Sequence, residues 1–153
     1  MFDLTGKTQL IAGAGRGIGL VIARVLRQQG ATVLINDLFE DRAAEATKML
    51  SQEGLQARAV PFDATDYAAV CKAIEDNSVI DILVNNAGIP GREGMQLQAF
   101  EETSPQEWRA MVDINLYGQL NCNHAVLPGM RERGWGRIIV VSSDAGRGGT
   151  ATG

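Results

Sequence analysis

Residues 9–26 read QLIAGAGRGIGLVIARVL and place four glycines at alternate positions, Gly13, Gly15, Gly17 and Gly19, between a short apolar run and a helical pattern. Glycines at such a junction allow a tight turn, a close approach of the backbone to a ligand, and close packing of the helix on the strand. The stretch therefore predicts a strand, a ligand-binding loop and a helix. Enzymes of different chemistry use loops of this kind, so the ligand has to be inferred from the rest of the chain.

The chain repeats this alternation of strand and helix. Apolar runs predict strands at 7–12, 31–37, 55–63, 79–88 and 136–143, and helical patterns predict helices at 17–30, 40–53, 65–76 and 105–132. Strands joined by helices of this length imply right-handed crossovers and a parallel sheet covered on both faces. We therefore expect an α/β fold in a single domain over residues 1–153, a Rossmann-type doubly wound sheet with five strands in the order 3-2-1-4-5.

Local signals fix some helix ends. Ser104 followed by Pro105 and Glu107 predicts a capping box at the start of the long fourth helix, which Pro128 is expected to kink. Thr65 or Asp66 is expected to cap the helix before it.

Composition excludes several classes of function. The net charge of −4 and the absence of Lys or Arg runs argue against a nucleic-acid surface, and no apolar window is long enough for a membrane span or leader, so we expect a cytoplasmic protein. Cys71 and Cys122 fit no metal-ligand spacing and His124 is the single histidine. We expect two buried, reduced thiols and no metal site.

Polar residues and glycines follow the predicted strands. Ligands bind beyond the carboxyl ends of the strands in open α/β sheets. Those ends carry the glycine loop, Asp37, Asp63, residues 85–88 and the pair Ser142 and Ser143. Each of these residues alone could belong to a turn or a helix cap. Because polar residues or glycines follow every predicted strand, together they favour a binding site.

The glycines match two loop patterns. The pattern G-x-G-x-x-G fails, because its last glycine would fall on Ile18 or Leu20. G-x-G-x-G fits at 13, 15 and 17, as in many S-adenosylmethionine-dependent methyltransferases. G-x-x-x-G-x-G fits at 13, 17 and 19, and it resembles the cofactor loop of the short-chain dehydrogenase/reductase family.

Distant segments favour the second pattern. DILVNNAG (81–88), DINLYG (113–118) and GRIIVVSS (136–143) resemble, in order, that family's fourth-strand motif, the segment with its active-site asparagine, and its fifth strand with the active-site serine. The resemblance covers nearly the whole chain. It implies an oxidoreductase that transfers a hydride between a nicotinamide cofactor and a secondary alcohol or ketone.

The resemblance also implies a set of cofactor-binding residues. These are Gly13, Arg16, Gly17, Ile18 and Gly19 in the first loop, Asp37 at the adenosine ribose, Asp63 and Ala64 at the adenine, and Asn86, Ala87 and Gly88 near the nicotinamide. Asp37 would accept hydrogen bonds from the ribose hydroxyls and would repel a 2′-phosphate, which favours NAD over NADP. Arg16 favours NADP, because NADP-using relatives often have a basic residue in the glycine loop, but we expect Asp37 to have the larger effect. The family usually has Thr where this chain has Ala12, so we expect a less rigidly held loop.

The implied catalytic residues are Ser143, which would orient the substrate oxygen, and Asn115, which would hold a water in the proton relay. The family's Tyr-x-x-x-Lys segment follows the serine by about a dozen residues and would lie past Gly153. Neither Tyr67 nor Tyr117 has Lys four residues later. We therefore expect a truncated copy without turnover, with its C-terminal strands missing, the edge of the fifth strand open, and Met111, Ile114 and Val126 exposed.

Three functions stay open. The first is the short-chain oxidoreductase, acting on a hydroxyacyl or sugar-acid type of substrate and forming a homo-oligomer through the 105–132 helix in its full-length form. The second is a non-catalytic half-domain that binds a dinucleotide or a partner. The third is a methyltransferase.

Overall fold

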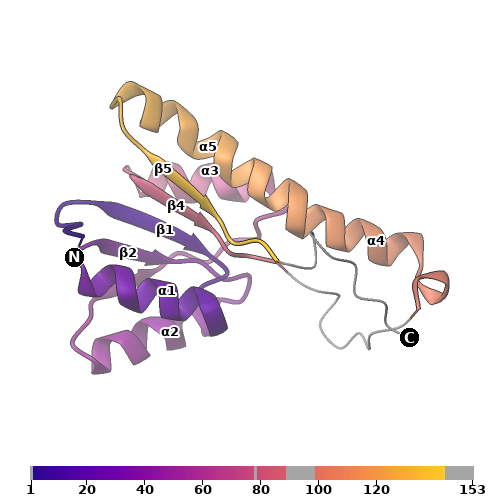
Figure 1. Ribbon diagram of the computed structural model, residues 1–153, viewed down its shortest axis with the longest axis horizontal. Coiled ribbons are helices and arrows are strands. Elements are labelled where there is room, and N and C mark those ends of the chain that lie inside the picture. Colours follow the sequence, from indigo (N-terminus) through magenta and orange to yellow (C-terminus); the bar gives the residue numbers. More distant parts are fainter. Residues whose placement is uncertain (1, 78, 89–98, 144–153) are drawn as a thin grey trace.

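The protein contains a five-stranded parallel sheet in the order β3-β2-β1-β4-β5 (Figure 1). The computed structural model describes residues 2–77, 79–88 and 99–143. The strands are β1 (Thr8–Ala12), β2 (Thr32–Ile35), β3 (Ala57–Ala59), β4 (Ile82–Asn85) and β5 (Arg137–Val140). The expected strand order is confirmed. Each strand is shorter than expected: β1 begins one residue later, and the other four also end before the residues at their expected carboxyl ends.

Helices cover both faces of this sheet, as Figure 1 shows. One layer holds α1 (Gly17–Gln28) and α2 (Glu40–Gln52), and the other holds α3 (Tyr67–Asp76) and α5 (Gly118–Glu132). A short 3-10 helix (Phe100–Glu102) and α4 (Pro105–Val112) precede α5. The doubly wound arrangement expected from the alternation of strands and helices is therefore present.

Side chains of alternate strand residues enter two separate cores. In β2, Leu34 belongs to the core under α3 and α5, whereas Val33 and Ile35 belong to the core under α1 and α2. All three side chains are buried, as the continuous apolar run predicts. The two cores therefore pack on opposite faces of the sheet, and the loops after β1, β2 and β4 at its carboxyl edge begin at buried residues.

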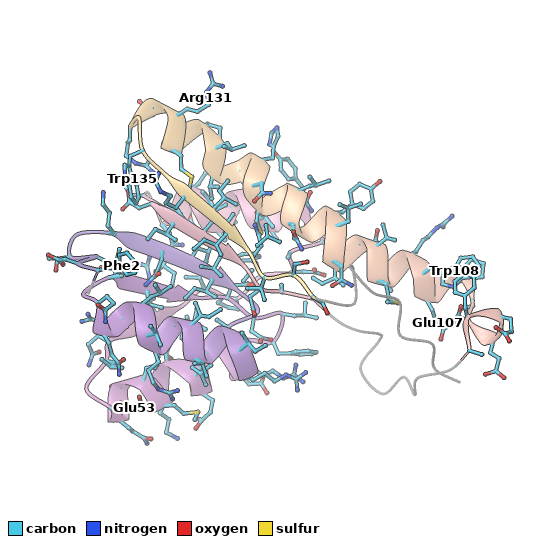
Figure 2. All side chains as sticks on the ribbon, in the orientation of Figure 1. Phe2, Glu53, Glu107, Trp108, Arg131 and Trp135 are labelled. Carbon is cyan, nitrogen blue, oxygen red and sulfur yellow. The ribbon has the colours of Figure 1, made fainter. Side chains whose placement is uncertain are left out.

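The expected long helix contains a π-helical turn. Ser104 and Glu107 form the predicted capping box, with the Glu107 carboxylate accepting from the Ser104 backbone N–H at 2.6 Å. Glu107 and Trp108 mark the start of α4, which extends beyond the sheet (Figure 2). Residues Asp113–Tyr117 are π-helical, and α5 then continues past Pro128 to Glu132. Such π-turns are often found at functional sites.

The expected exposure of the long helix is partly wrong. Val126 is 3% exposed, because its helix face packs into the core between α3 and the sheet. Met111 and Ile114 are half-buried. On β5, Ile138, Ile139 and Val140 are 36%, 46% and 48% exposed, which agrees with an open strand in the described part of the chain.

Two further expectations concern the state of the cysteines and the presence of a membrane-spanning helix. Cys122 is buried and Cys71 is half-buried, and neither forms a disulfide. No helix of residues 2–77, 79–88 and 99–143 is long and apolar enough to cross a membrane.

Candidate functional site

A cavity of about 660 Å³ lies at the carboxyl ends of the central strands. Its walls come from the glycine loop, the residues after β2, the residues after β3, and the loop after β4. Its lining residues are Gly13, Arg16, Ile18, Asn36, Asp37, Leu38, Phe39, Arg42, Phe62, Asp63, Ala64, Asn86, Ala87, Gly88 and Ile114. Segments far apart in the sequence thus meet at the edge where an open α/β sheet binds ligands.

Most of the predicted cofactor residues line this cavity. Gly13, Arg16, Ile18, Asp37, Asp63, Ala64, Asn86, Ala87 and Gly88 do so, whereas Gly17 and Gly19 are outside its lining. The structure also brings in Asn36, Phe39 and Arg42, which the sequence reasoning missed. Asn36 could have been found by the same strand-end rule that found its neighbour Asp37.

The glycines of the first loop have different surroundings. A Cβ atom on Gly13 would lie 2.8 Å from the Ala87 Cα atom, and one on Gly19 would lie 2.6 Å from the Asn86 amide nitrogen, so both glycines let the first loop pack on the loop after β4. Gly17 has a φ of +58° and open space on its Cβ side, at the first residue of α1. Gly17 is therefore the glycine that leaves the N-terminus of α1 accessible, where backbone N–H groups favour an anion.

Two asparagines, the buried Asn36 and the half-buried Asn86, hold the first loop in place. The Asn36 side-chain oxygen accepts from the Gly13 N–H at 3.3 Å, and its amide nitrogen donates to the Phe62 carbonyl at 2.9 Å. The Asn86 amide nitrogen donates to the Gly13 carbonyl at 2.8 Å and to the Ala12 carbonyl at 3.3 Å. These contacts join the loop to its neighbours on both sides, and the less rigid loop expected from Ala12 stays a prediction.

Asp37 supplies a buried carboxylate to the cavity wall. It is 7% exposed, and its Oδ1 atom accepts from the Phe39 backbone N–H at 3.1 Å. The Arg42 guanidinium lies over the Phe39 ring, 4.2 Å from the ring centroid. Arg16 and Arg42 line the same cavity, so basic and acidic groups share its wall.

Asp63 closes a turn and does not cap α3. Its Oδ1 atom accepts from both the backbone N–H and the hydroxyl of Thr65, each at 2.8 Å. Asp66 is the residue that caps α3, through hydrogen bonds from the Ala68 and Ala69 N–H groups. The Ala64 carbonyl accepts from the Asn121 amide at 2.9 Å, which fixes the segment to α5.

The two predicted catalytic residues are both outside the lining of this cavity, and Asn115 lies next to a residue that lines it. Asn115 is in the π-helical turn, and its Oδ1 atom would be 2.7 Å from a Cβ atom on Gly88, which lines the cavity. Ser143 is exposed and follows β5, whose exit is tied to β4 by the hydrogen bond from Val141 N–H to the Asn85 carbonyl, 2.9 Å long. Asn85 is buried and donates to the Asn123 side chain at 2.8 Å.

A dinucleotide fits this arrangement. The accessible helix N-terminus can accept a phosphate, and the Asp37 carboxylate can accept hydrogen bonds from hydroxyl groups. The cavity volume is in the range of small-molecule sites. Within the described residues no cluster of His, Cys, Asp and Glu could hold a metal ion.

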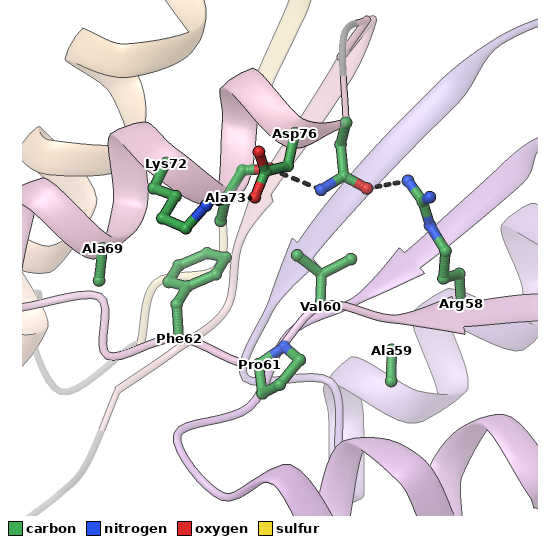
Figure 3. Close-up of a pocket in the computed structure, with 10 residues that line it drawn as sticks. Arg58, Ala59, Val60, Pro61, Phe62, Ala69, Lys72, Ala73 and Asp76 are labelled. Atoms are coloured by element: carbon green, nitrogen blue, oxygen red, sulfur yellow. Dashed lines mark hydrogen bonds and ion pairs between the residues drawn. The ribbon is translucent and has the colours of Figure 1, made fainter.

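A second cavity of about 420 Å³, between β3 and α3, lacks such features (Figure 3). Its polar side chains bond to one another or to the backbone: Arg58 donates to Asn77, Asn77 donates to the Ala73 carbonyl, and Lys72 pairs with Asp76 at 3.0 Å. These contacts explain the position of the side chains without a ligand.

Known proteins match both the sequence and the fold. The family model of the short chain dehydrogenases matches residues 7–153. The chain is 39% identical to 5-keto-D-gluconate 5-reductase from Escherichia coli strain K12, over 94% of this chain and 56% of that protein. The chain thus spans about half the length of the curated relatives it matches.

Solved structures agree with this match. A 3-oxoacyl-[acyl-carrier protein] reductase from Brucella melitensis with bound NAD superposes with a TM-score of 0.89 at 38% identity, covering 95% of this chain and 56% of that one. A gluconate 5-dehydrogenase from Burkholderia cenocepacia in complex with NADP and tartrate has a TM-score of 0.86 at 38% identity, covering 97% and 58%. With the glycine loop, the fourth-strand motif and the sheet order all in place, this chain belongs to the short-chain dehydrogenase family.

Proposed function

We propose that the protein is an oxidoreductase that transfers a hydride between NAD(H) and a secondary alcohol or ketone. The observation that supports it most is the buried Asp37 carboxylate in a cavity that also contains the glycine loop and the loop after β4. A dinucleotide offers hydroxyl groups to such a carboxylate and phosphates to the loop. The methyltransferase interpretation loses support, because the family model of the short chain dehydrogenases matches residues 7–153.

We further propose a preference for NAD over NADP. The Asp37 carboxylate would repel a 2′-phosphate, whereas the Arg16 and Arg42 guanidinium groups in the same cavity would attract one. Asp37 should dominate because it is almost fully buried, where a charge interacts more strongly than at the exposed position of Arg16. A fluorescence titration tests this: tighter binding of NADPH than of NADH would contradict it.

The chemistry needs a proton donor and hydrogen bonds to the substrate oxygen. Bound nicotinamide would supply or accept the hydride. In our proposal Ser143 donates a hydrogen bond to the substrate oxygen and stabilises its developing charge, and Asn115 holds a water that relays the proton. Proton donation itself is the role of a tyrosine with a lysine four residues later, a pair that this sequence does not contain.

This division of roles predicts binding without turnover for the 153-residue chain. The chain should quench or enhance NADH fluorescence, yet leave the absorbance at 340 nm unchanged when a 3-oxoacyl thioester or a keto sugar acid is added. Both substrate classes are proposed, since the similar proteins named above act on one or the other. Consumption of NADH by the pure chain would contradict this part of the proposal.

We also propose a cytoplasmic homo-oligomer that assembles through the α4–α5 face. Val112, Leu116, Leu120 and Leu127 are between 43% and 51% exposed and recur at helical spacing along this face. In the dimer, these four apolar side chains would pack against the same four side chains of a second copy of the chain. Sedimentation of the chain and of Leu120→Lys tests the interface: the variant should shift to monomer, and an unchanged sedimentation coefficient would contradict it.

A further inference from the structure

We infer that Gly15 determines cofactor specificity, because its missing side chain makes room for the Asp37 carboxylate. This inference rests on the proposed binding of NAD(H). A Cβ atom built on Gly15 would lie 2.8 Å from Asp37 Cγ, closer still to Asp37 Oδ2, and 3.0 Å from Arg42 Cβ. Contacts below 3.0 Å are essentially never seen for real Cβ atoms, so any side chain at position 15 must displace the carboxylate.

The backbone of Gly15 does not itself require glycine. Gly13 and Gly17 have positive φ angles, which L-residues rarely adopt, whereas Gly15 does not. The requirement at position 15 is therefore one of space beside Asp37. This separates Gly15 from Gly13, whose missing Cβ atom faces the loop after β4, and from Gly19, whose missing Cβ atom faces the Gly13 carbonyl and the Asn86 side chain.

The carboxylate cannot make room without losing contacts. Asp37 Oδ1 accepts from the Phe39 N–H, and Phe39 is the N-cap residue of α2. The Cβ atom of Arg42, in the first turn of α2, is also close, 3.0 Å from the same position. A methyl group at position 15 must then either break the bond to Phe39 or turn the carboxylate away from the loop. Either change moves the negative charge that the proposed function assigns to the ribose hydroxyls.

The consequence concerns NADH more than NADPH. A displaced carboxylate accepts fewer hydrogen bonds from the hydroxyls, which weakens NADH binding. It also repels a 2′-phosphate less, which offsets the loss for NADPH. A larger residue at position 15 therefore lowers the affinity for NADH relative to that for NADPH, and glycine preserves the preference for NADH.

A double-mutant cycle tests this on the 153-residue chain. Gly15→Ala, Asp37→Ala and the double variant are titrated with NADH and with NADPH, and their melting temperatures are measured without cofactor. Gly15→Ala should raise the Kd for NADH by about tenfold, the size expected when a hydrogen bond to a charged group is lost. Its Kd for NADPH should stay within about twofold, and in the Asp37→Ala background the substitution should change both Kd values by less than about twofold.

The melting temperatures separate the steric contact between Gly15 and Asp37 from the proposed binding of NAD(H). Without cofactor, Gly15→Ala should lower the melting temperature by about 3 °C. The drop should be clearly smaller in the Asp37→Ala background, where only the contact with the Arg42 Cβ atom remains. If the effect of Gly15→Ala on the melting temperature depends on Asp37 but the unmodified chain does not bind NADH, the proposed function is contradicted and the steric contact between the two residues is not. Equal weakening of NADH and NADPH, or a loss that persists without the Asp37 carboxylate, would overturn the inference. Gly129→Ala is the matched control: its Cβ atom would meet the end of the Arg133 side chain, away from the cavity, so NADH affinity should be unchanged.

Discussion

Asn36 and Gly13 are joined by a hydrogen bond of 3.3 Å between the Asn36 side-chain oxygen and the Gly13 backbone N–H. The same side chain donates to the Phe62 carbonyl at 2.9 Å, and the Ala14 N–H donates to the Asn36 carbonyl at 2.7 Å. One buried residue therefore connects the glycine loop to the segment that carries Asp63. The shape of the cavity depends on this connection.

Asn36→Ala should weaken both stability and cofactor binding. The substitution leaves the Gly13 N–H and the Phe62 carbonyl without this buried partner, which costs about 1–3 kcal/mol of unfolding free energy. A loosened loop should also raise the Kd for NADH by about tenfold, equivalent to about 1.4 kcal/mol. Urea unfolding and an NADH titration measure the two effects. Asn77→Ala, outside this cavity, is the control, and an unchanged Kd for folded Asn36→Ala would refute the positioning role.

Ser104→Ala should destabilise the protein through the start of α4. Ser104 accepts from the Glu107 N–H at 3.4 Å and its backbone N–H donates to the Glu107 carboxylate, so alanine removes half of the capping box. A lost cap of this type costs about 1 kcal/mol, measurable by urea unfolding. Ser51→Ala, on the exposed surface of α2, should change stability by less than about 0.5 kcal/mol. Equal effects of the two variants would be the contrary result.

Gln9→Leu should stabilise the protein. Gln9 is fully buried in β1, and within the described part of the chain neither its amide nitrogen nor its amide oxygen has a hydrogen-bond partner. Leucine has a similar volume and removes the cost of burying these atoms, so the unfolding free energy should rise by about 1–2 kcal/mol. A loss of stability on chemical denaturation would show that the amide is satisfied in solution.

The two cysteines should differ in reactivity. Burial raises the pKa of the Cys122 thiol to about 12, whereas Cys71 is only half-buried. Because the thiolate is the reactive form, an alkylating reagent at pH 8 should modify Cys71 in the native protein and Cys122 only after unfolding. Peptide mass spectrometry identifies the modified residue, and rapid native labelling of Cys122 would contradict its burial.

The same thiol makes stability depend on pH. Its pKa is higher in the folded protein than the ordinary value of 9.0, so the unfolded chain ionises first as the pH rises. Stability from this group is complete below pH 9 and falls between pH 9 and about 12. Cys122→Ala should flatten the pH dependence of unfolding in this window, and an unchanged slope would show that another group is responsible.

The sequence predicts the parts of the site that depend on strand ends and glycine spacing. The strand order and the place of Asp37, Asp63 and residues 86–88 follow from the alternation of strands and helices and from motifs that resemble a known family. The π-helical turn at Asp113–Tyr117 and the burial of Val126 do not, because both depend on how the long helix packs against α3 and the sheet. The contact between Gly15 and Asp37 joins residues of different segments, so only the folded chain reveals it.

Cofactor binding by the chain is best tested by parallel titrations with NADH, NADPH and S-adenosylmethionine, each repeated on Asp37→Ala. We predict that NADH binds most tightly, that Asp37→Ala raises its Kd by about tenfold, and that S-adenosylmethionine does not bind. Tighter binding of S-adenosylmethionine than of NADH, or NADH binding that is insensitive to Asp37→Ala, would show that the cavity is not the NAD site described above.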